Sequence, residues 1–276
     1  MRARTWQSGI EENWRGRWRR NRAIGPSFAS RHSRSRTCNL QIAIHYSQKR
    51  NVEYDSGMAE YFELESRDQA NVLRLAGDET NRLTRARVVA LLEIVRELSG
   101  RSTSDFRHST SDFRLLASDF QPKPLIITGN KHFFSAGADL NEIAALTGAE
   151  AYEFATMGQA LMNAVANFPA PTYAAVWGYC MGGGLDLALS CRYRIAHPHA
   201  VFGHRGAALG LITGWGGTQR LPRLVGKARA LEMFLAAEKV HAAKALEFGL
   251  VDGIAEEPVQ ACLERITTKA RRHEGI

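Results

Sequence analysis

Two glycine-rich turns carry the residues that are best suited to chemistry, and each follows a strand-like segment. The first, FSAGADL, spans 134–140, and the second, GYCMGGGLD, spans 178–186. Small residues let backbone N–H groups approach a ligand closely, and the first N–H groups of a helix are unpaired and favour negative charge. Each turn alone is better explained by tight packing. Together, the two turns can supply one N–H group each to a single oxygen, which makes an oxyanion hole in which each donor contributes roughly 10²–10³ in rate.

The sequence lacks the motifs of common phosphate, dinucleotide and metal sites. The phosphate-loop pattern GxxxxGK[ST] does not occur, and the glycine cluster does not fit GxGxxG with a downstream acid. The four cysteines are widely spaced and form no CxxC pair, so they predict neither a zinc site nor a disulfide framework. We expect free, buried thiols in a reducing compartment, and no bound metal.

The elements that position the two turns alternate along the chain. The sequence predicts strands at 71–76, 124–128, 171–177, 192–196, 200–203 and 250–254. It predicts helices at 84–98, 149–168, 182–191, 216–225, 227–237, 241–248 and 257–270. Strands that alternate with helices are typical of an α/β domain.

The chain divides into a basic leader and a main domain. Residues 1–57 lack apolar periodicity, and we expect them to be disordered. Their twelve basic and four acidic residues account for the whole formal net charge of +8. The leader could be a targeting segment or a polyanion-binding segment, but we favour an upstream extension whose true start is Met58. Because the remainder is neutral, we expect no nucleic-acid partner for it.

The main domain is predicted to span 58–276. Within it, the tripeptide Ser-Asp-Phe recurs every seven residues between 104 and 120, which predicts a loop insertion at 101–121 that arose by tandem duplication. No stretch approaches the ~20 consecutive apolar residues that a membrane helix needs. No apolar segment follows the early arginines, as a secretory signal would require. We therefore expect a cytoplasmic protein without a membrane partner.

Four motifs together resemble the enoyl-CoA hydratase/isomerase, or crotonase, family. They are FSAGADL at 134–140, GYCMGGGLDLAL at 178–189, GWGGTQRLPRLVGKARALEMF at 214–234 and AKALEFGLVDGI at 243–254. The resemblance covers residues from about 60 to 270. It implies an α/β fold, a crotonase-like spiral of ββα units with a short C-terminal helical region. It also implies acyl-CoA thioester substrates, with coenzyme A as part of the substrate and no separate cofactor. A homotrimer or dimer of trimers and a role in fatty acid metabolism follow from it too.

The resemblance assigns roles to residues of both turns. It implies that the backbone N–H groups of Ala138 and Gly183 are the oxyanion donors. Further residues are then expected to contact the CoA thioester or the acyl group: Ala136, Asp139, Leu140, Tyr179 and Gly182. For Asp139, a structural role is the alternative.

The proton-transfer residues depart from the family pattern. Hydratases of the family use two glutamates, and this chain has Asp186 at the first position and Gly206 at the second. His204 and Arg205 lie beside this gap. The histidine can act as an acid or base or simply bond to the backbone, and the arginine can bind a carboxylate or a phosphate. We count His204, Arg205 and Gly206 as substrate-binding candidates and Asp186 as the catalytic carboxylate, although Asp186 could also only complement the helix dipole.

The leading hypothesis is therefore an enoyl-CoA hydratase/isomerase-type enzyme that works through a stabilised enolate. One alternative is decarboxylation of a malonyl-type CoA, which needs the oxyanion hole but less proton transfer. The other is a non-catalytic CoA-ester-binding paralogue, which the missing glutamate and the inserted loop would favour.

Overall fold

The computed structural model describes residues 61–100 and 121–273, all within one of the two compact units of the chain, Gln41–Ile276. The predicted leader and the predicted loop insertion, except for Gln121, lie outside the described residues.

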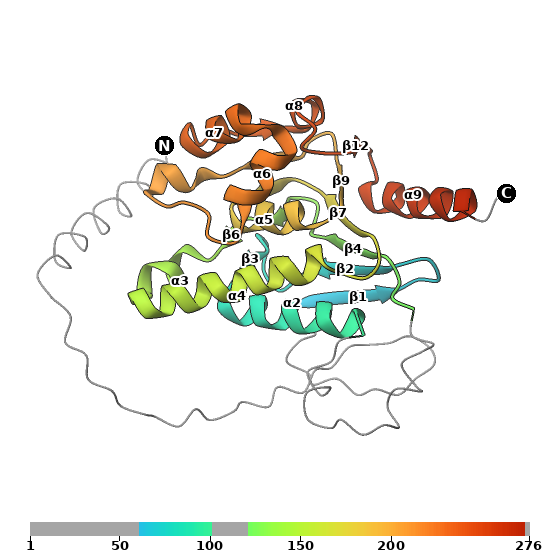
Figure 1. Ribbon diagram of the computed structural model, residues 1–276, viewed down its shortest axis with the longest axis horizontal. Coiled ribbons are helices and arrows are strands. Elements are labelled where there is room, and N and C mark those ends of the chain that lie inside the picture. The colour runs from blue at the N-terminus through green and yellow to red at the C-terminus, as the bar shows by residue number, and fades with distance from the viewer. Residues whose placement is uncertain (1–60, 101–120, 274–276) are drawn as a thin grey trace, which may run out of the picture. The chain divides into compact units, whose positions relative to one another are not determined.

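A six-stranded sheet forms the centre of this unit (Figure 1). Its strands, in spatial order, are β1 (Phe62–Ser66), β2 (Asn71–Leu75), β4 (Leu125–Thr128), β7 (Thr172–Val176), β9 (Tyr193–Ala196) and β12 (Gly253–Ile254). The pair β1/β2 is antiparallel, and the other neighbours are parallel. Parallel strands are covered on both faces, which explains why β4 and β7 are buried along their whole length.

Helices cover both faces of this sheet. Helices α2 (Arg85–Leu98) and α4 (Gly148–Ala166) lie side by side (Figure 1), and α9 (Pro258–His273) packs against β7 and β9. The alternation of side chains along β4 shows the two layers. Leu125 and Ile127 join the main hydrophobic core, whereas Ile126 joins a smaller cluster with Cys262 of α9.

Two smaller sheets carry the glycine-rich turns. One contains β11 (Val240–His241), β10 (Val201–Gly203), β8 (Tyr179–Met181) and β5 (Phe133–Ser135), in that order. The other pairs β3 (Arg82–Leu83) with β6 (Gly137–Ala138). The remaining helices are α3 (Leu140–Ala145), α5 (Gly183–Ser190), the 3₁₀ helix η5 (Arg205–Leu209), α6 (Gly217–Val225), α7 (Lys227–Leu235) and α8 (Ala242–Glu247).

The predicted α/β class is confirmed, and most predicted elements lie within two residues of their observed bounds. The long helix α4 begins with a reciprocal capping box, in which Thr147 and Glu150 satisfy each other's backbone N–H groups. The predicted strand at 250–254 was too long, because only Gly253 and Ile254 pair with β9. The short strands β3, β5, β6, β8 and β11 were not predicted, since two or three residues carry no periodicity, and β1 and α3 were also not given bounds.

Candidate active site

The two glycine-rich turns meet at the start of α5. An added Cβ at Gly137 would lie 3.0 Å from the nitrogen of Gly183, and an added Cβ at Gly183 would lie 3.4 Å from the nitrogen of Ala138. The backbone nitrogens of Ala138 and Gly183 are therefore close neighbours. Gly137 has φ +93, and its Cβ would also be 2.7 Å from the oxygen of Met181. Only glycine fits this crossing of the two turns, because another residue would force the chains apart.

Hydrogen bonds hold each turn in place from outside. The amide of Asn81, whose own φ is a left-handed 49, donates to the backbone oxygens of Phe133 (2.9 Å) and Phe134 (3.3 Å). The hydroxyl of Ser135 donates to the oxygen of Asn81 (2.7 Å). On the second turn, the N–H group of Gly182 donates to the oxygen of β10's last residue, Gly203 (2.9 Å). The backbone donors are thus fixed before any ligand binds, which is what stabilisation of a developing negative charge requires.

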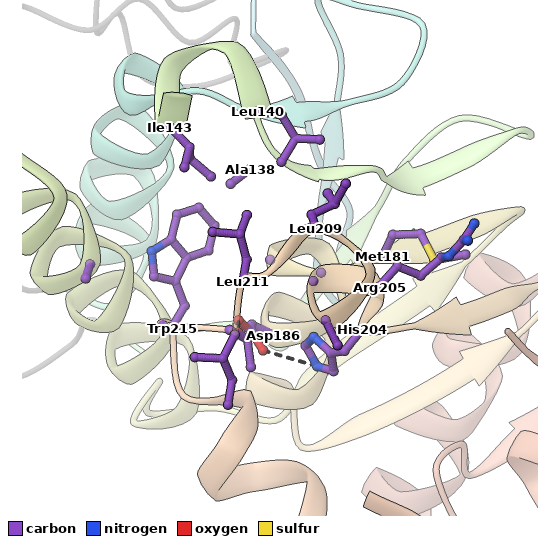
Figure 2. Close-up of a pocket in the computed structure, with 18 of the residues that line it drawn as sticks. Ala138, Leu140, Ile143, Met181, Asp186, His204, Arg205, Leu209, Leu211 and Trp215 are labelled. Carbon is purple, nitrogen blue, oxygen red and sulfur yellow. Dashed lines mark hydrogen bonds and ion pairs between the residues drawn. The ribbon is translucent and has the colours of Figure 1, made fainter. Parts of the chain in front are cut away.

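A cavity of about 440 Å³ opens beside these nitrogens. Its lining is mostly apolar, and Figure 2 shows Leu140 and Ile143 on one side and Asp186 and His204 on the other. The apolar lining residues are Ala136, Ala138, Leu140, Ile143, Leu146, Ala151, Phe154, Ala155, Met181, Ala207, Leu209, Leu211, Ile212, Trp215 and Phe234. Such a cavity is suited to a hydrocarbon group with a polar end near the two turns.

Asp186 is the buried carboxylate of this cavity. It follows Gly183 by one helical turn of α5, so both residues lie on the same face of the helix. Its side chain is only 1% exposed, and burial raises its pKa to about 7. A hydrogen bond that the Thr213 hydroxyl donates to Oδ2 acts in the opposite direction, as does the charge of Arg220. A carboxyl group with a pKa near neutrality can both accept and donate a proton under physiological conditions.

His204 lies directly beside this carboxylate. Its Nε2 is 3.4 Å from Oδ1 of Asp186, and the side chain is 4% exposed (Figure 2). Burial lowers the pKa of His204 to about 4, so the imidazole is neutral at pH 7. The ring of Phe234, 5.0 Å away between centroids, packs on it. A carboxyl group and an imidazole therefore lie in contact at the edge of an apolar cavity.

Gly206 marks the position where the family pattern has a second carboxylate. The N–H group of Leu211 donates to the oxygen of Gly206 (2.8 Å) across η5. An added Cβ at Gly206 would lie 2.7 Å from the oxygen of Leu211. Because the backbone fills the space that a side chain would need, the loop itself is built without that carboxylate.

Most of the site residues that the sequence predicted come together. Nine of them line the cavity: Ala136, Ala138, Leu140, Gly182, Gly183, Asp186, His204, Arg205 and Gly206. Asp139 and Tyr179 are not among the lining residues. The carboxylate of Asp139 caps α3 through the N–H group of Asn141 and binds Arg82 (2.8 Å), and Tyr179 is 38% exposed beside Phe133.

The sequence level missed most of the apolar lining, and also Thr213, Trp215 and Phe234, which contact the predicted site residues. Trp215 fits against two glycines, since an added Cβ at Gly158 would lie 2.1 Å from its indole nitrogen and one at Gly183 would lie 2.4 Å from its ring. The motif at 214–234 contains Trp215 and Phe234, so it pointed to this region. Its spacing alone could not show that Trp215 packs against Gly183 and that Phe234 packs on His204, because the fold brings these partners from distant positions in the chain.

The described residues contain neither a cluster of metal ligands nor a membrane-spanning helix. In residues 61–100 and 121–273, no three His, Cys, Asp or Glu side chains gather as a metal site. Over the same ranges, no helix is both long and apolar enough for a membrane span. Cys180, Cys191 and Cys262 are buried free thiols, as predicted, whereas Cys38 lies outside the described residues.

The chain is similar to known proteins in both sequence and structure. The family model described as enoyl-CoA hydratase/isomerase matches residues 107–272. A probable enoyl-CoA hydratase of Bacillus subtilis (strain 168) is 46% identical over 130 residues. The match covers 47% of this chain and 50% of that protein, so the chain spans about half of the length of this relative.

Solved structures agree over a larger part of the chain. The structure of Pseudomonas aeruginosa DspI has a TM-score of 0.68 at 31% identity and covers 81% of this chain and 84% of its own. An enoyl-CoA hydratase from Bacillus anthracis has a TM-score of 0.64 at 29% identity, over 75% of this chain and 76% of its own. The predicted crotonase-type fold is confirmed by these similarities.

Proposed function

Because the chain belongs to the enoyl-CoA hydratase/isomerase family, we propose that it acts on acyl-CoA thioesters through an enolate. The backbone N–H groups of Ala138 and Gly183 bind the thioester oxygen, on which negative charge develops when an enolate forms. The convergence of these two nitrogens carries the proposal. Donors that are already fixed in a water-poor site stabilise such a charge without reorganisation, and each is worth roughly 10²–10³ in rate.

Asp186 supplies the proton transfer. It lies one helical turn beyond Gly183, so the carboxyl group is close to the carbon atoms next to the bound thioester carbonyl. With a pKa of about 7, it can give a proton to the enolate carbon or remove one from it. Both hydration of a 2-enoyl-CoA and migration of its double bond proceed through that exchange.

The substrate is an acyl-CoA thioester with an apolar acyl group, and no separate cofactor takes part. The apolar cavity wall holds the acyl chain, while Ala136, Leu140 and Gly182 border the thioester. Arg205, at the start of η5, lies at the cavity where it can bind a phosphate or carboxylate of the substrate.

The assembly is a homotrimer or dimer of trimers in the cytoplasm, with a role in fatty acid metabolism. Two exposed leucines of α7, Leu231 and Leu235, support an interface on that helix. Light scattering of the purified protein measures the assembly, and a monomer at micromolar concentration would exclude it.

The test of the activity separates enolate formation from the full reaction. Exchange of the C2 protons of butyryl-CoA for deuterium in D₂O reports the enolate, and turnover of crotonyl-CoA and longer enoyl-CoAs reports hydration or isomerisation. We expect Asp186→Asn to slow both by about 10²–10⁴. Asp68→Asn, which changes an exposed carboxylate, is the matched control and should have no effect.

Two results would reject this proposal. Absence of exchange and of turnover on every thioester, in folded protein that binds CoA esters, would favour a CoA-ester-binding paralogue without catalytic activity. Wild-type rates in Asp186→Asn would place the proton transfer on another group.

A second candidate is decarboxylation of a malonyl-type CoA. The absence of a carboxylate at Gly206 and the position of Arg205 favour it, because the arginine can bind the carboxylate that leaves as CO₂. Methylmalonyl-CoA is the substrate to use. Release of CO₂ without turnover of any enoyl-CoA would support decarboxylation, and the opposite result would exclude it.

A further inference from the structure

We propose that His204 is the second acid–base group of the site and that it forms, together with Asp186, a pair that shares one proton. The inference rests on the proposed enolate chemistry and adds to it a catalytic residue at a position different from that of the missing carboxylate. Nε2 of His204 lies 3.4 Å from Oδ1 of Asp186, and both residues line the cavity.

The two facing atoms are both buried. Neither Oδ1 of Asp186 nor Nε2 of His204 has a hydrogen-bond partner of good geometry in the described part of the chain, although the backbone N–H groups of Trp215 and Gly217 act on the carboxylate and lower its pKa. A buried polar atom without a partner costs about 1–3 kcal/mol, so folded proteins rarely keep two such atoms side by side unless they serve a purpose. A shared proton, or a water or substrate oxygen between them, satisfies both atoms at once.

The surrounding residues fix this contact and leave little room for another arrangement. The backbone of Gly217 closes one side, because a Cβ there would lie 2.1 Å from Oδ1 and 2.9 Å from Nε2. The ring of Phe234 covers the imidazole, and the hydroxyl of Thr213 holds the other carboxylate oxygen. The pair is therefore positioned by three different elements of the fold.

The nearby charges agree with a single shared proton. Arg220 of α6 acts on the carboxylate, and Arg205 follows the histidine in η5; α7 contributes the uncharged ring of Phe234. Burial is the cause of the lowered pKa of the imidazole, so its resting form at pH 7 is neutral. With the pKa of Asp186 near 7 and that of His204 near 4, the pair holds one proton in the interval between these values.

The proton balance of hydration follows from this starting state. Asp186 is protonated, and Nε2 of the neutral imidazole carries a lone pair. A water oxygen bonds to C3 of the enoyl group, and a proton of that water goes to Nε2. The π pair of the C2–C3 double bond forms the C1–C2 double bond of the enolate, and the π pair of the carbonyl moves to the thioester oxygen at Ala138 and Gly183. The enolate then takes the carboxyl proton of Asp186 at C2. Transfer of the imidazolium proton to Oδ1 restores the pair, and one water has been added in total.

The variant His204→Gln tests the catalytic role. It keeps a side chain of similar reach but cannot accept the proton. We expect kcat for hydration to fall by about 10²–10³, with KM for the thioester changed less than about threefold. The acidic limb of the kcat/KM profile, which reports protonation of the imidazole, should disappear. The exposed His132→Gln is the matched control and should keep the wild-type rate and both limbs.

A second measurement does not depend on how well a variant folds. Histidine ¹⁵N resonances of the wild-type protein, followed from pH 4 to 8, should show His204 responding to the titration of Asp186, and the response should vanish in Asp186→Asn. An ordinary, independent titration of His204 would overturn the proposal. So would an unchanged rate and pH profile in folded His204→Gln.

The same measurements distinguish an error in the role of His204 from an error in the proposed function. Wild-type protein that neither exchanges C2 protons nor turns over any thioester contradicts the enolate chemistry itself. Wild-type protein that is active while His204→Gln is equally active contradicts only the role of the histidine.

Discussion

The hydroxyl of Thr213 donates a hydrogen bond to Oδ2 of Asp186, although 27 positions of the chain separate the two residues. This bond stabilises the carboxylate form and opposes the rise in pKa that burial causes. The loop between η5 and α6 thus sets how readily the acid of α5 gives up its proton.

Replacement of Thr213 by valine should raise the pKa of Asp186 further. Valine keeps the shape of threonine but donates no hydrogen bond, and bonds to charged groups contribute about 1.5–3 kcal/mol. The alkaline limb of kcat/KM should therefore move to higher pH. Thr156→Val, which removes an exposed hydroxyl bonded within α4, is the control. A profile identical to that of the wild type would contradict the role of Thr213.

Asp186 should make the folded protein less stable as the pH rises. Its folded pKa of about 7 lies above the unfolded value of about 3.9, so the folded state binds more protons between these two values. The free energy of unfolding consequently falls as the pH increases through this window. Asp186→Asn removes this pH dependence. In urea denaturation, the free energy of unfolding of the variant relative to that of the wild type should therefore rise by on the order of 3 kcal/mol from pH 5 to pH 8. An equal difference at both pH values would contradict the burial of a titrating carboxyl group.

Alanine at Gly217 should disrupt the acid–base pair with little loss of helix stability. The added Cβ would lie 2.1 Å from Oδ1 of Asp186, so the carboxylate must move. We expect at least a ~10-fold loss of kcat, since overpacking shifts side chains from their positions. At Gly148→Ala, also in a first helical turn, the described residues place no atom within 4 Å of the new Cβ, so activity should persist. Full activity in Gly217→Ala would show that the observed contact is not needed.

Alanine at Gly137 should separate the two oxyanion donors. Its Cβ would press on the oxygen of Met181 (2.7 Å) and the nitrogen of Gly183 (3.0 Å). We expect C2 exchange of butyryl-CoA to fall by about 10²–10³. Gly249→Ala shares the left-handed φ, +74, yet its Cβ meets no described atom within 4 Å. Gly249→Ala therefore reports the effect of backbone strain alone, without displacement of the donors. An equal loss of C2 exchange in both variants would argue against the oxyanion hole.

A larger side chain at Ala155 should shorten the acyl group that the site accepts. Ala155 of α4 lines the cavity, and phenylalanine there would occupy part of its 440 Å³. Turnover of long enoyl-CoAs should fall at least ~10-fold more than that of crotonyl-CoA, because only the longer chain needs the filled space. Ala149→Phe, on the exposed start of the same helix, is the control. A uniform effect on all chain lengths would mean that the acyl group binds elsewhere.

The sequence by itself determined the α/β alternation, the main helices and the two turns. These features are local: Gly137 and Gly182 need a positive φ, and α4 begins where Thr147 and Glu150 can cap it. Resemblance to the family added the pairing of Ala138 with Gly183, which the structure then brought together. Short strands such as β6 were beyond reach, because two residues have no detectable period.

Only the tertiary structure brought the proposed proton-transfer groups together. Asp186 lies in α5, His204 at the N-cap of η5, Thr213 in the loop before α6 and Gly217 at the start of α6. No periodic spacing in the sequence links Asp186 to the other three residues. At the sequence level, Gly206 was a missing glutamate and His204 its neighbour in a loop. Packing turned the imidazole toward Asp186 and closed the space at Gly206 with the backbone of Leu211. The burial that shifts both pKa values is a property of the assembled core, so a linear pattern of residues cannot show it.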